Sequence, residues 1–341
     1  MIFLGCDGGS TKTELLVADA AGRCLAHRIF PGCNYAFLGR DGFARHMQAC
    51  VAGVLEDAHI APSQVTAAMF GLPVYGEVPG TEEEIPQILC ALLPGCPQVR
   101  IENDAVAGWG GSLGGQPGIH VVAGTGSIAY GQDEAGQACR VGGWSLLFSD
   151  EGSCSWVGRQ VITAFVKQAD GRLPRTALYS LVRKAAGLRD NDLYFSQVLQ
   201  IDLRQDASKL ASLQRIALEA ARQGDHTMQA AYRAAAGELV QMVRAVKSQL
   251  HLAGTPRVSY AGGLFHAGAL VLAPFSVGVH ALGCRLVQPR FSPILGAAAL
   301  AARDMLDAET LERMLTRLDA ALHAPCLLYT SPSPRDMRRC R

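Results

Sequence analysis

The chain has 341 residues, of which 49% are hydrophobic and 18% charged, and its formal net charge at pH 7 is +1. This balance excludes a strongly basic protein whose partner is nucleic acid. The apolar stretches are too short to span a membrane, and Asp7 interrupts the N-terminal apolar run, so we expect neither a membrane helix nor a signal peptide.

The eleven cysteines are scattered, odd in number and without a CxxC pair. This usage is typical of reduced thiols in a cytoplasmic protein. The histidines show no metal-ligand spacing. Because the chain is longer than one average domain, we expect two domains.

The chain opens with a glycine-rich turn between two apolar runs, residues 1–4 and 15–18. The turn reads Gly5-Cys6-Asp7-Gly8-Gly9-Ser10-Thr11-Lys12-Thr13, which predicts a β-hairpin. Successive N–H groups in such a turn form a concave nest for anionic oxygens, and Asp7 suits that place if Mg²⁺ lies between it and phosphates. An ordinary tight hairpin with a polar tip explains the same residues. The stretch is not a P-loop, because residues 13–19 alternate like a strand and do not open a helix.

The segment that follows predicts a mixed α/β unit. Strands are expected at residues 23–30, 65–72 and 99–102, and helices at residues 43–58 and 82–93. Asn34, in the loop after the first of these strands, serves either as a capping residue or as an amide that contacts a substrate. Asn103 and Asp104 end the last strand, where α/β sheets place their ligands.

A second glycine-rich hairpin appears farther along the chain. Residues 110–118 have the composition of an interdomain linker. Strands predicted at residues 119–123 and 128–132 then flank Gly124-Thr125-Gly126-Ser127. Two hairpins of one shape, each opening its own α/β unit, indicate a duplication whose halves face a shared cleft.

The C-terminal half predicts more helix than strand. We expect a helix at residues 155–168, a helix-rich region at 172–252, and a strand at 258–261 that enters Gly262-Gly263. A helix of small residues, suited to close packing, begins at Pro293, and the last helix covers residues 311–322. Residues 326–341 have no periodicity and contain Ser-Pro-Ser-Pro, so we exclude them from the fold as a non-native or disordered tail.

Together these pieces resemble the BadF/BadG/BcrA/BcrD ATPase family of the actin/hexokinase/Hsp70 superfamily, on its N-acetylglucosamine kinase branch. Eight ordered blocks carry the resemblance: Asp7-Gly8-Gly9-Ser10-Thr11-Lys12-Thr13, Asn34, Asn103-Asp104-Ala105, Gly124-Thr125-Gly126-Ser127, Gly142-Gly143-Trp144, Asp150-Glu151-Gly152-Ser153, Gly224-Asp225 and Ala261-Gly262-Gly263. The resemblance implies an α/β fold of two ribonuclease-H-like domains, residues 1–115 and 116–292, with ATP in the cleft between them. It also implies that the helical segment 293–323 packs back onto the first domain.

The resemblance assigns a cofactor-binding role to several of these blocks. It implies that the first hairpin holds the β- and γ-phosphates, that Asp7 acts on Mg²⁺ through water, and that the second turn closes on the phosphates. It further implies that Gly224, Asp225, Gly262 and Gly263 line the adenosine pocket. The phosphate-binding residues would be Asp7, Gly8, Gly9, Ser10, Thr11, Lys12, Thr13, Gly124, Thr125, Gly126 and Ser127.

Asp104 would be the general base on the sugar hydroxyl, a role that suits phosphoryl transfer, which needs a positioned nucleophile. Its alternative is an N-cap of the following helix. The resemblance implies sugar contacts from Asn34, Asn103, Asp104, Gly143, Trp144 and Asp150. A capping box is the alternative for Asp150, and a place in the core is the alternative for Trp144. Arg140 is expected to be a solvated charge.

The resemblance thus implies an ATP- and Mg²⁺-dependent kinase for the 6-hydroxyl of N-acetylglucosamine or glucosamine, working as a homodimer. The family suggests a second function, the ATPase activator of a 2-hydroxyacyl-CoA dehydratase. That function needs a [4Fe–4S] cluster held by a cysteine from each subunit. Cys154 lies near the relevant helix, but the block around it matches the kinase pattern. A sensor without catalysis is a third alternative, and the presence of Asp104 argues against it.

Overall fold

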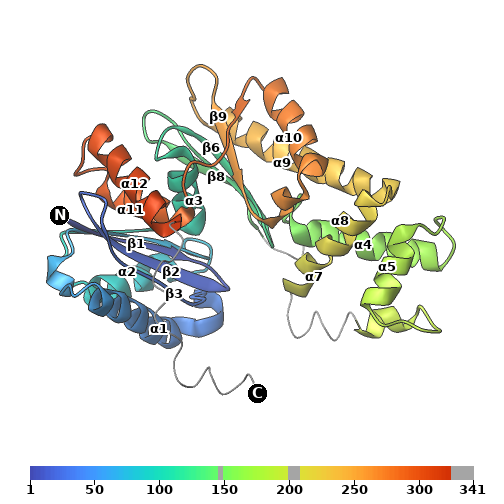
Figure 1. The fold of residues 1–341 in the computed structure, drawn as a ribbon, viewed down its shortest axis with the longest axis horizontal. Helices are drawn as coiled ribbons and strands as arrows, with labels where there is room; N and C mark the ends of the chain where they lie inside the picture. The colour runs from blue at the N-terminus through green and yellow to red at the C-terminus, as the bar shows by residue number, and fades with distance from the viewer. Residues whose placement is uncertain (145–148, 199–207, 324–341) are drawn as a thin grey trace, which may run out of the picture.

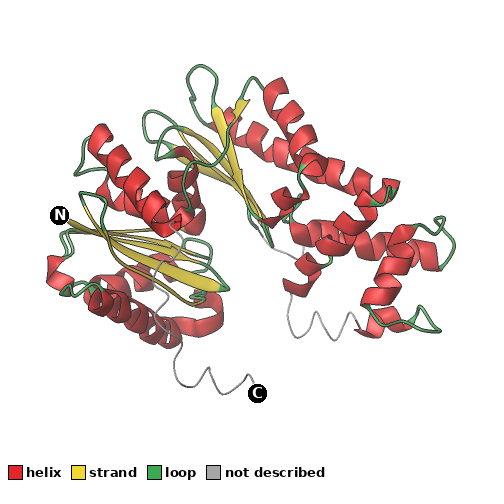
Figure 2. Ribbon diagram, viewed as in Figure 1, coloured by secondary structure: helices red, strands yellow, loops and turns green. Residues whose placement is uncertain are grey.

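The computed structural model describes residues 1–144, 149–198 and 208–323. The described residues form two five-stranded sheets, each covered by helices (Figures 1 and 2). The tail predicted at residues 326–341 lies outside the described residues. The described part of the chain contains no helix long and apolar enough to cross a membrane.

The first sheet has the strand order β3-β2-β1-β4-β5. β1 pairs with β2 in an antiparallel hairpin, whereas β1, β4 and β5 run parallel. Its strands are β1 (Ile2–Gly8), β2 (Lys12–Asp19), β3 (Cys24–Pro31), β4 (Ala67–Leu72) and β5 (Gln98–Asn103).

The second sheet repeats the plan of the first. Its strand order is β8-β7-β6-β9-β10. β6 takes the place of β1: it pairs antiparallel with β7, which pairs antiparallel with β8, and on its other side β6, β9 and β10 run parallel. Its strands are β6 (Gly118–Ala123), β7 (Ser127–Gln132), β8 (Ala138–Gly142), β9 (Arg257–Ala261) and β10 (Arg285–Leu286). The two predicted hairpins are therefore the leading pairs of two equivalent sheets.

Helices cover both faces of the first sheet, whose strands alternate between two apolar clusters. Leu4 and Leu15 face the cluster of α1 (Tyr35–Asp57) and α2 (Thr81–Leu92). Phe3 and Leu16 face the cluster of α3 (Asp104–Leu113), α11 (Pro293–Ala302) and α12 (Ala308–His323). The second sheet buries its core against α4 (Cys154–Ala169), α5 (Ala177–Ala185), α8 (Gln214–Arg222), α9 (His226–Gln249) and α10 (Ala269–Ala281).

The remaining described elements are short. One is the helix α7 (Ser208–Ser212). Two 3₁₀ turns are η1 (Pro62–Gln64) and η2 (Gly263–Ala267).

The linker predicted at residues 110–118 is wrong for its first half. Gly110 and Gly111 lie inside α3, which continues to Leu113, and both are buried. These glycines serve close packing, because a Cβ on Gly111 would lie 2.3 Å from the carbonyl oxygen of Ser292. α3 thus crosses α11 backbone to backbone, and α11 returns to pack on the first sheet.

Candidate active site

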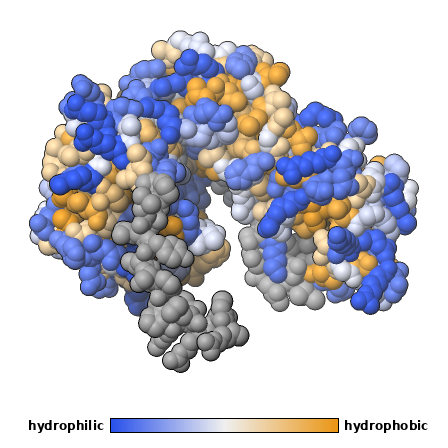
Figure 3. All heavy atoms as spheres, viewed as in Figure 1, coloured by the Kyte–Doolittle hydropathy of each residue, from blue (hydrophilic) through white to orange (hydrophobic). Residues whose placement is uncertain are grey.

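A cleft of about 430 Å³ opens where the carboxyl ends of the leading strands of both sheets meet. Residues from both sheets line it: Asp7, Glu77, Asp104, Ala105, Gly108, His120, Val122, Gly124, Thr125, Gly126, Ser127, Ile128, Gly143, Asp150, Ala261, Gly262 and Pro293. A second cavity of about 600 Å³ adjoins it, and five residues line both: Gly108, His120, Ala261, Gly262 and Pro293. Figure 3 shows the face of the molecule that is hollowed between the two halves.

The first hairpin is held by the loop that precedes α1. The N–H of Cys33 donates to the carbonyl of Gly9 at 3.0 Å, and the Asn34 side-chain amide donates to Ser10 Oγ at 2.8 Å. A Cβ on Gly8 would lie 2.6 Å from Cys33 Sγ, so only glycine allows this close approach. The exposed tip of the hairpin, Ser10 and Thr11, is thereby fixed in position.

Asn34 caps α1, the first of its two predicted roles. Its side-chain oxygen accepts the Ala36 N–H at 2.9 Å while its amide holds Ser10. Both polar ends of the side chain are therefore engaged within the protein. Its contact with a sugar stays a prediction.

Lys12 and Thr13 are not among the residues that line the cleft. Lys12 Nζ donates to Glu14 Oε2 at 2.6 Å, and His27 Nε2 lies 2.8 Å from the other oxygen of that carboxylate. Thr13 is fully buried beneath the hairpin. Among the described residues, neither lines the cleft.

Asp104 occupies the first turn of α3, directly after the end of β5. Asn103 is the N-cap, since its side-chain oxygen accepts the Ala105 N–H at 3.1 Å. The alternative that Asp104 itself caps the helix is therefore wrong. Its carboxylate is left to line the cleft beside Asp7.

Both Asp7 and Asp104 have raised pKa values, and Asp104 contributes to the shift of Asp7. Burial, followed by the neighbouring Asp104, raises the pKa of Asp7 to about 7. Burial, followed by the charge of Glu77, raises the pKa of Asp104 to about 6, although Arg140 acts in the opposite direction. Two buried carboxylates without a full countercharge favour a bound cation or a proton at this place.

The second turn is built on Asp150. Ser127 N–H donates to Asp150 Oδ1 at 3.3 Å, and a Cβ on Gly126 would lie 2.9 Å from Asp150 Oδ2. Asp150 has a φ of 59°, which is uncommon outside glycine. Ser153, with its hydroxyl accepting from Trp156 N–H, is the N-cap of α4, so Asp150 does not cap that helix.

Arg140 is not the solvated charge that the sequence analysis predicted. Its Nη1 donates to Glu77 Oε1 at 2.7 Å, and its Nη2 donates to the Gly143 carbonyl at 3.0 Å. The ion pair joins β8 of the second sheet to the loop after β4 of the first sheet. Glu77, which the sequence analysis did not single out, lines the cleft and also accepts from Asn103 Nδ2 at 2.9 Å.

Trp144, Gly224 and Asp225 are among the predicted ligand residues that line neither cavity. Trp144 is 79% exposed, so its alternative as a core residue is wrong, and its stacking on a sugar is untested. Asp225 caps α9 by accepting the Met228 N–H at 3.0 Å and also accepts from the Thr176 hydroxyl. Within the described residues, Gly224 and Asp225 line neither cavity. By contrast, Gly262 lines both cavities, and a Cβ added to it would lie 2.4 Å from the Ala123 carbonyl oxygen. Gly263, the next residue, begins η2.

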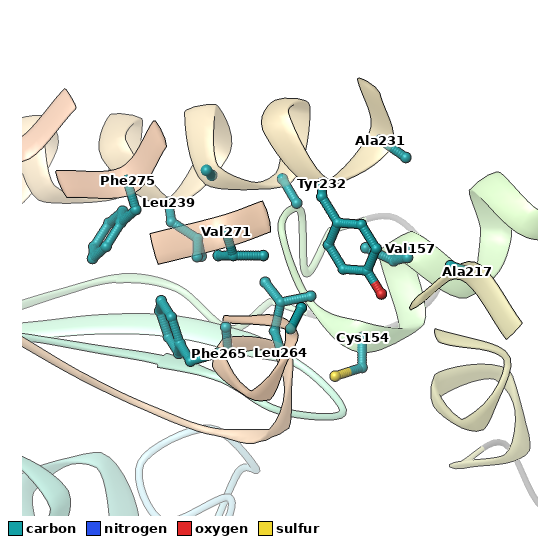
Figure 4. Packing of buried hydrophobic residues seen from close by; sticks show 14 of the residues in the cluster. Cys154, Val157, Ala217, Ala231, Tyr232, Leu239, Leu264, Phe265, Val271 and Phe275 are labelled. Atoms are coloured by element: carbon teal, nitrogen blue, oxygen red, sulfur yellow. The ribbon is translucent and has the colours of Figure 1, made fainter. Parts of the chain in front are cut away.

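Cys154 belongs to the apolar core of the second half. Its side chain is 7% exposed, and it packs in one cluster with Val157, Tyr232 and Leu264 (Figure 4). Burial raises the pKa of its thiol to about 11. A cluster shared between subunits needs a thiolate at the surface, whereas the Cys154 thiol is buried in the core.

Comparisons with known proteins agree with this architecture. The model of the BadF/BadG/BcrA/BcrD ATPase family matches residues 4–301. N-acetyl-D-glucosamine kinase of Dictyostelium discoideum is 27% identical over 312 residues, which cover 88% of this chain and 97% of that protein. N-acetylmuramic acid/N-acetylglucosamine kinase of Clostridium acetobutylicum is 26% identical over 250 residues, or 73% of this chain and 80% of that protein.

A solved structure from Chromobacterium violaceum, provisionally described as an N-acetylglucosamine kinase, superposes with a TM-score of 0.70 at 25% identity. The superposition covers 88% of this chain and 98% of that one. Since the family match extends over most of the residues, the chain belongs to the BadF/BadG/BcrA/BcrD ATPase family. Its two sheets form the actin-like fold that the sequence predicted.

Proposed function

We propose that this chain, a member of the BadF/BadG/BcrA/BcrD ATPase family, transfers the γ-phosphoryl group of ATP to the 6-hydroxyl of N-acetylglucosamine or glucosamine. The observation that carries the proposal is the position of Asp104, whose carboxylate lines one cleft with the second glycine turn and Asp7. The relatives in Dictyostelium discoideum and Clostridium acetobutylicum, both named as amino-sugar kinases, support the same substrate class.

Asp104 acts as the general base. Burial and the charge of Glu77 raise its pKa to about 6, so it is ionised at neutral pH and still basic enough to accept a hydroxyl proton. Its place in the first turn of α3, behind a cap made by Asn103, keeps the side chain from moving with a loop. Deprotonating and orienting one hydroxyl is the part of phosphoryl transfer that a carboxylate supplies.

The two glycine turns bind the phosphates. The second turn lines the cleft through Gly124–Ser127, the first hairpin reaches the cleft through Asp7, and glycine allows an anion to approach the backbone closely. The turn at Gly124 is anchored, since the Cys154 N–H at the start of α4 donates to the Gly124 carbonyl at 2.9 Å. Lys12 is paired with Glu14, so we assign anion binding to the backbone rather than to this lysine. The adjoining cavity at Gly262 takes the adenosine.

Asp7 holds Mg²⁺. Its buried carboxylate, with a pKa raised to about 7, gains from a neighbouring cation. Mg²⁺ commonly uses one or two protein carboxylates and completes its shell with waters and phosphate oxygens, which suits a site where the described residues offer no larger ligand cluster. When bound, the ion neutralises charge on the transferring phosphoryl group.

Asp150, Gly143 and Asn103 contact the sugar, and Asp150 accepts from its hydroxyls. The cleft residues do not distinguish an acetylated from a free amino group, so N-acetylglucosamine and glucosamine are both included. The homodimer and the cytoplasmic location remain predictions.

The test is ADP release with ATP and Mg²⁺ in the presence of N-acetylglucosamine, glucosamine, N-acetylmannosamine, N-acetylmuramic acid, glucose or no sugar. We expect turnover that an amino sugar stimulates, with the preferred substrate ranked by kcat/KM and its phosphorylated position read by NMR. ATP hydrolysis that no sugar stimulates would overturn the proposal, and iron content would then test the dehydratase-activator alternative.

A further inference from the structure

An ion pair that includes the cleft residue Glu77 joins the two halves of the molecule near Asp104. Arg140 Nη1 on β8 lies 2.7 Å from Glu77 Oε1 in the loop between β4 and α2. Because β8 belongs to the second sheet and the loop to the first, the pair links the two halves of the molecule. Arg140 is further anchored by the carbonyl of Gly143, itself a cleft residue.

The same carboxylate oxygen also reaches toward the catalytic helix. Glu77 Oε1 accepts from Asn103 Nδ2 at 2.9 Å, and Asn103 caps α3 through its side-chain oxygen. Asp104 is the first residue of that helix. A continuous chain of contacts therefore runs from Arg140 through Glu77 and Asn103 to the turn that carries Asp104.

Stability does not explain this arrangement. The side chains of Glu77 and Arg140 are 26% and 36% exposed, and ion pairs with this access to solvent contribute little to folding. The loop that presents Glu77 is also strained, because the β-branched Val74 has a φ of 61°. The Val74 carbonyl accepts the Glu77 N–H at 3.0 Å, so the strained residue is joined directly to Glu77. Strain of this kind concentrates at functional sites.

We propose that Glu77 and Arg140 are positioning residues for Asp104: Glu77 fixes the cap of the catalytic helix, and Arg140 ties that carboxylate to the second sheet. The proposal rests on the proposed function of Asp104 as the base. The pair also sets the charge that Asp104 meets. Other titratable groups around Asp104 are Asp7 of β1 and Cys33 of the loop before α1.

The electrostatic consequence has opposite signs for the two partners. Glu77 raises the pKa of Asp104 and Arg140 lowers it. Glu77→Gln keeps an oxygen that accepts from Asn103 but removes the negative charge, so the pKa of Asp104 should fall. Arg140→Gln removes the positive charge, so the pKa should rise. Each shift should be about 0.5–1 pH unit for charges at this separation and exposure.

The experiment measures the titration of Asp104 directly. The protein is labelled with ¹³C at the aspartate carboxyl carbons, the Asp104 signal is assigned by its loss in Asp104→Asn, and its pH titration is followed in each variant. Arg140→Lys, which keeps the charge, is expected to titrate closer to wild type than Arg140→Gln. Arg172→Gln, which breaks an exposed pair with Asp170, is the control and is expected to leave the titration unchanged.

The acid limb of the kcat/KM profile should move with the titration, toward lower pH in Glu77→Gln and toward higher pH in Arg140→Gln. Unchanged titration in both variants, or shifts of the same sign, would overturn the proposal. The NMR readout needs no turnover, so this result is distinguishable from failure of the proposed function. If wild type shows no sugar-dependent turnover while the shifts are found, the proposed function fails and the pair's effect on Asp104 stands.

Discussion

Gly296 lies so close to Gly111 that a Cβ on Gly296 would sit 2.2 Å from the Gly111 amide nitrogen. The two glycines mark the crossing of α11 with α3, the helices that follow the last strand of each sheet. α3 carries Asp104 at its first turn, so the position of the base depends on this crossing.

Gly296→Ala is expected to destabilise the protein by about 3 kcal/mol or more, because the new methyl would also lie 2.0 Å from the Ala107 carbonyl oxygen. Chemical denaturation measures the change. The matched control is Gly237→Ala in α9, where nothing lies within 4 Å of the added Cβ and alanine should stabilise by about 0.5–1 kcal/mol. Equal effects of the two substitutions would show that the crossing tolerates a methyl group.

A buried histidine should make wild-type stability fall in acid. His120 Nδ1 lies 2.8 Å from Ser112 Oγ and 2.9 Å from Ser259 Oγ, and its Nε2 is buried without a partner among the described residues. Burial lowers its pKa from 6.5 to about 3. The unfolded chain therefore binds a proton below about pH 6.5 that the folded protein refuses, and stability is lost as pH falls through this window.

His120→Leu tests this dependence. Wild type should lose about 2–3 kcal/mol more than the variant between about pH 7.5 and 4.5. Urea unfolding of both proteins at several pH values gives the difference. A His120→Leu curve parallel to wild type would contradict the low pKa.

Asp7 should act with the opposite sign. Its pKa is raised from 3.8 to about 7, so ionising it costs stability as pH rises from about 4 to 7. Asp7→Asn is expected to be more stable than wild type at pH 8 by on the order of 2 kcal/mol, with no gain near pH 4. Thermal unfolding at both pH values measures this, and Mg²⁺-dependent turnover should be lost.

Asp19 provides the contrasting substitution. Its carboxylate accepts from the N–H groups of Ala21 and Arg23 and from the Arg23 guanidinium, which lowers its pKa despite burial. Asp19→Asn should therefore destabilise the protein at pH 8. A loss of stability in both Asp7→Asn and Asp19→Asn would show that Asp7 is favourably ionised in the folded protein.

The sequence predicted the parts of the fold that short-range patterns determine. The two hairpins appear in it because apolar alternation breaks at glycine and resumes within a few residues, and Asp104 stands at the end of a recognisable strand. The linker prediction failed because glycine has two uses. Gly110 and Gly111 permit a helix crossing with a segment far along the chain, and their local composition is that of a flexible connection.

The site residues that the sequence analysis missed depend on partners that are distant in the sequence. Glu77 and Arg140 are 63 residues apart, and each alone reads as a surface charge. Asn34 was predicted only in part. Its residue type suggested both a helix cap and a sugar contact, and the hydrogen bond from the Ala36 N–H identified the cap. His120 lies in an apolar strand, and nothing in the local sequence indicates its role. Its serine partners, Ser112 of α3 and Ser259 of β9, belong to other elements of the fold.

Asp104→Asn should abolish most turnover and leave nucleotide binding intact. The amide preserves the size of the side chain and leaves the Asn103 cap in place, but it cannot accept the hydroxyl proton. We expect kcat to fall by about 10²–10⁴-fold, as is typical when a general base is removed, with the calorimetric affinity for a non-hydrolysable ATP analogue close to wild type. Asp170→Asn, at an exposed carboxylate that does not line the cleft, is the control and should retain wild-type turnover. Full turnover in Asp104→Asn would exclude this residue as the base. Glu77 and Asp150, which also line the cleft, would then be tested next.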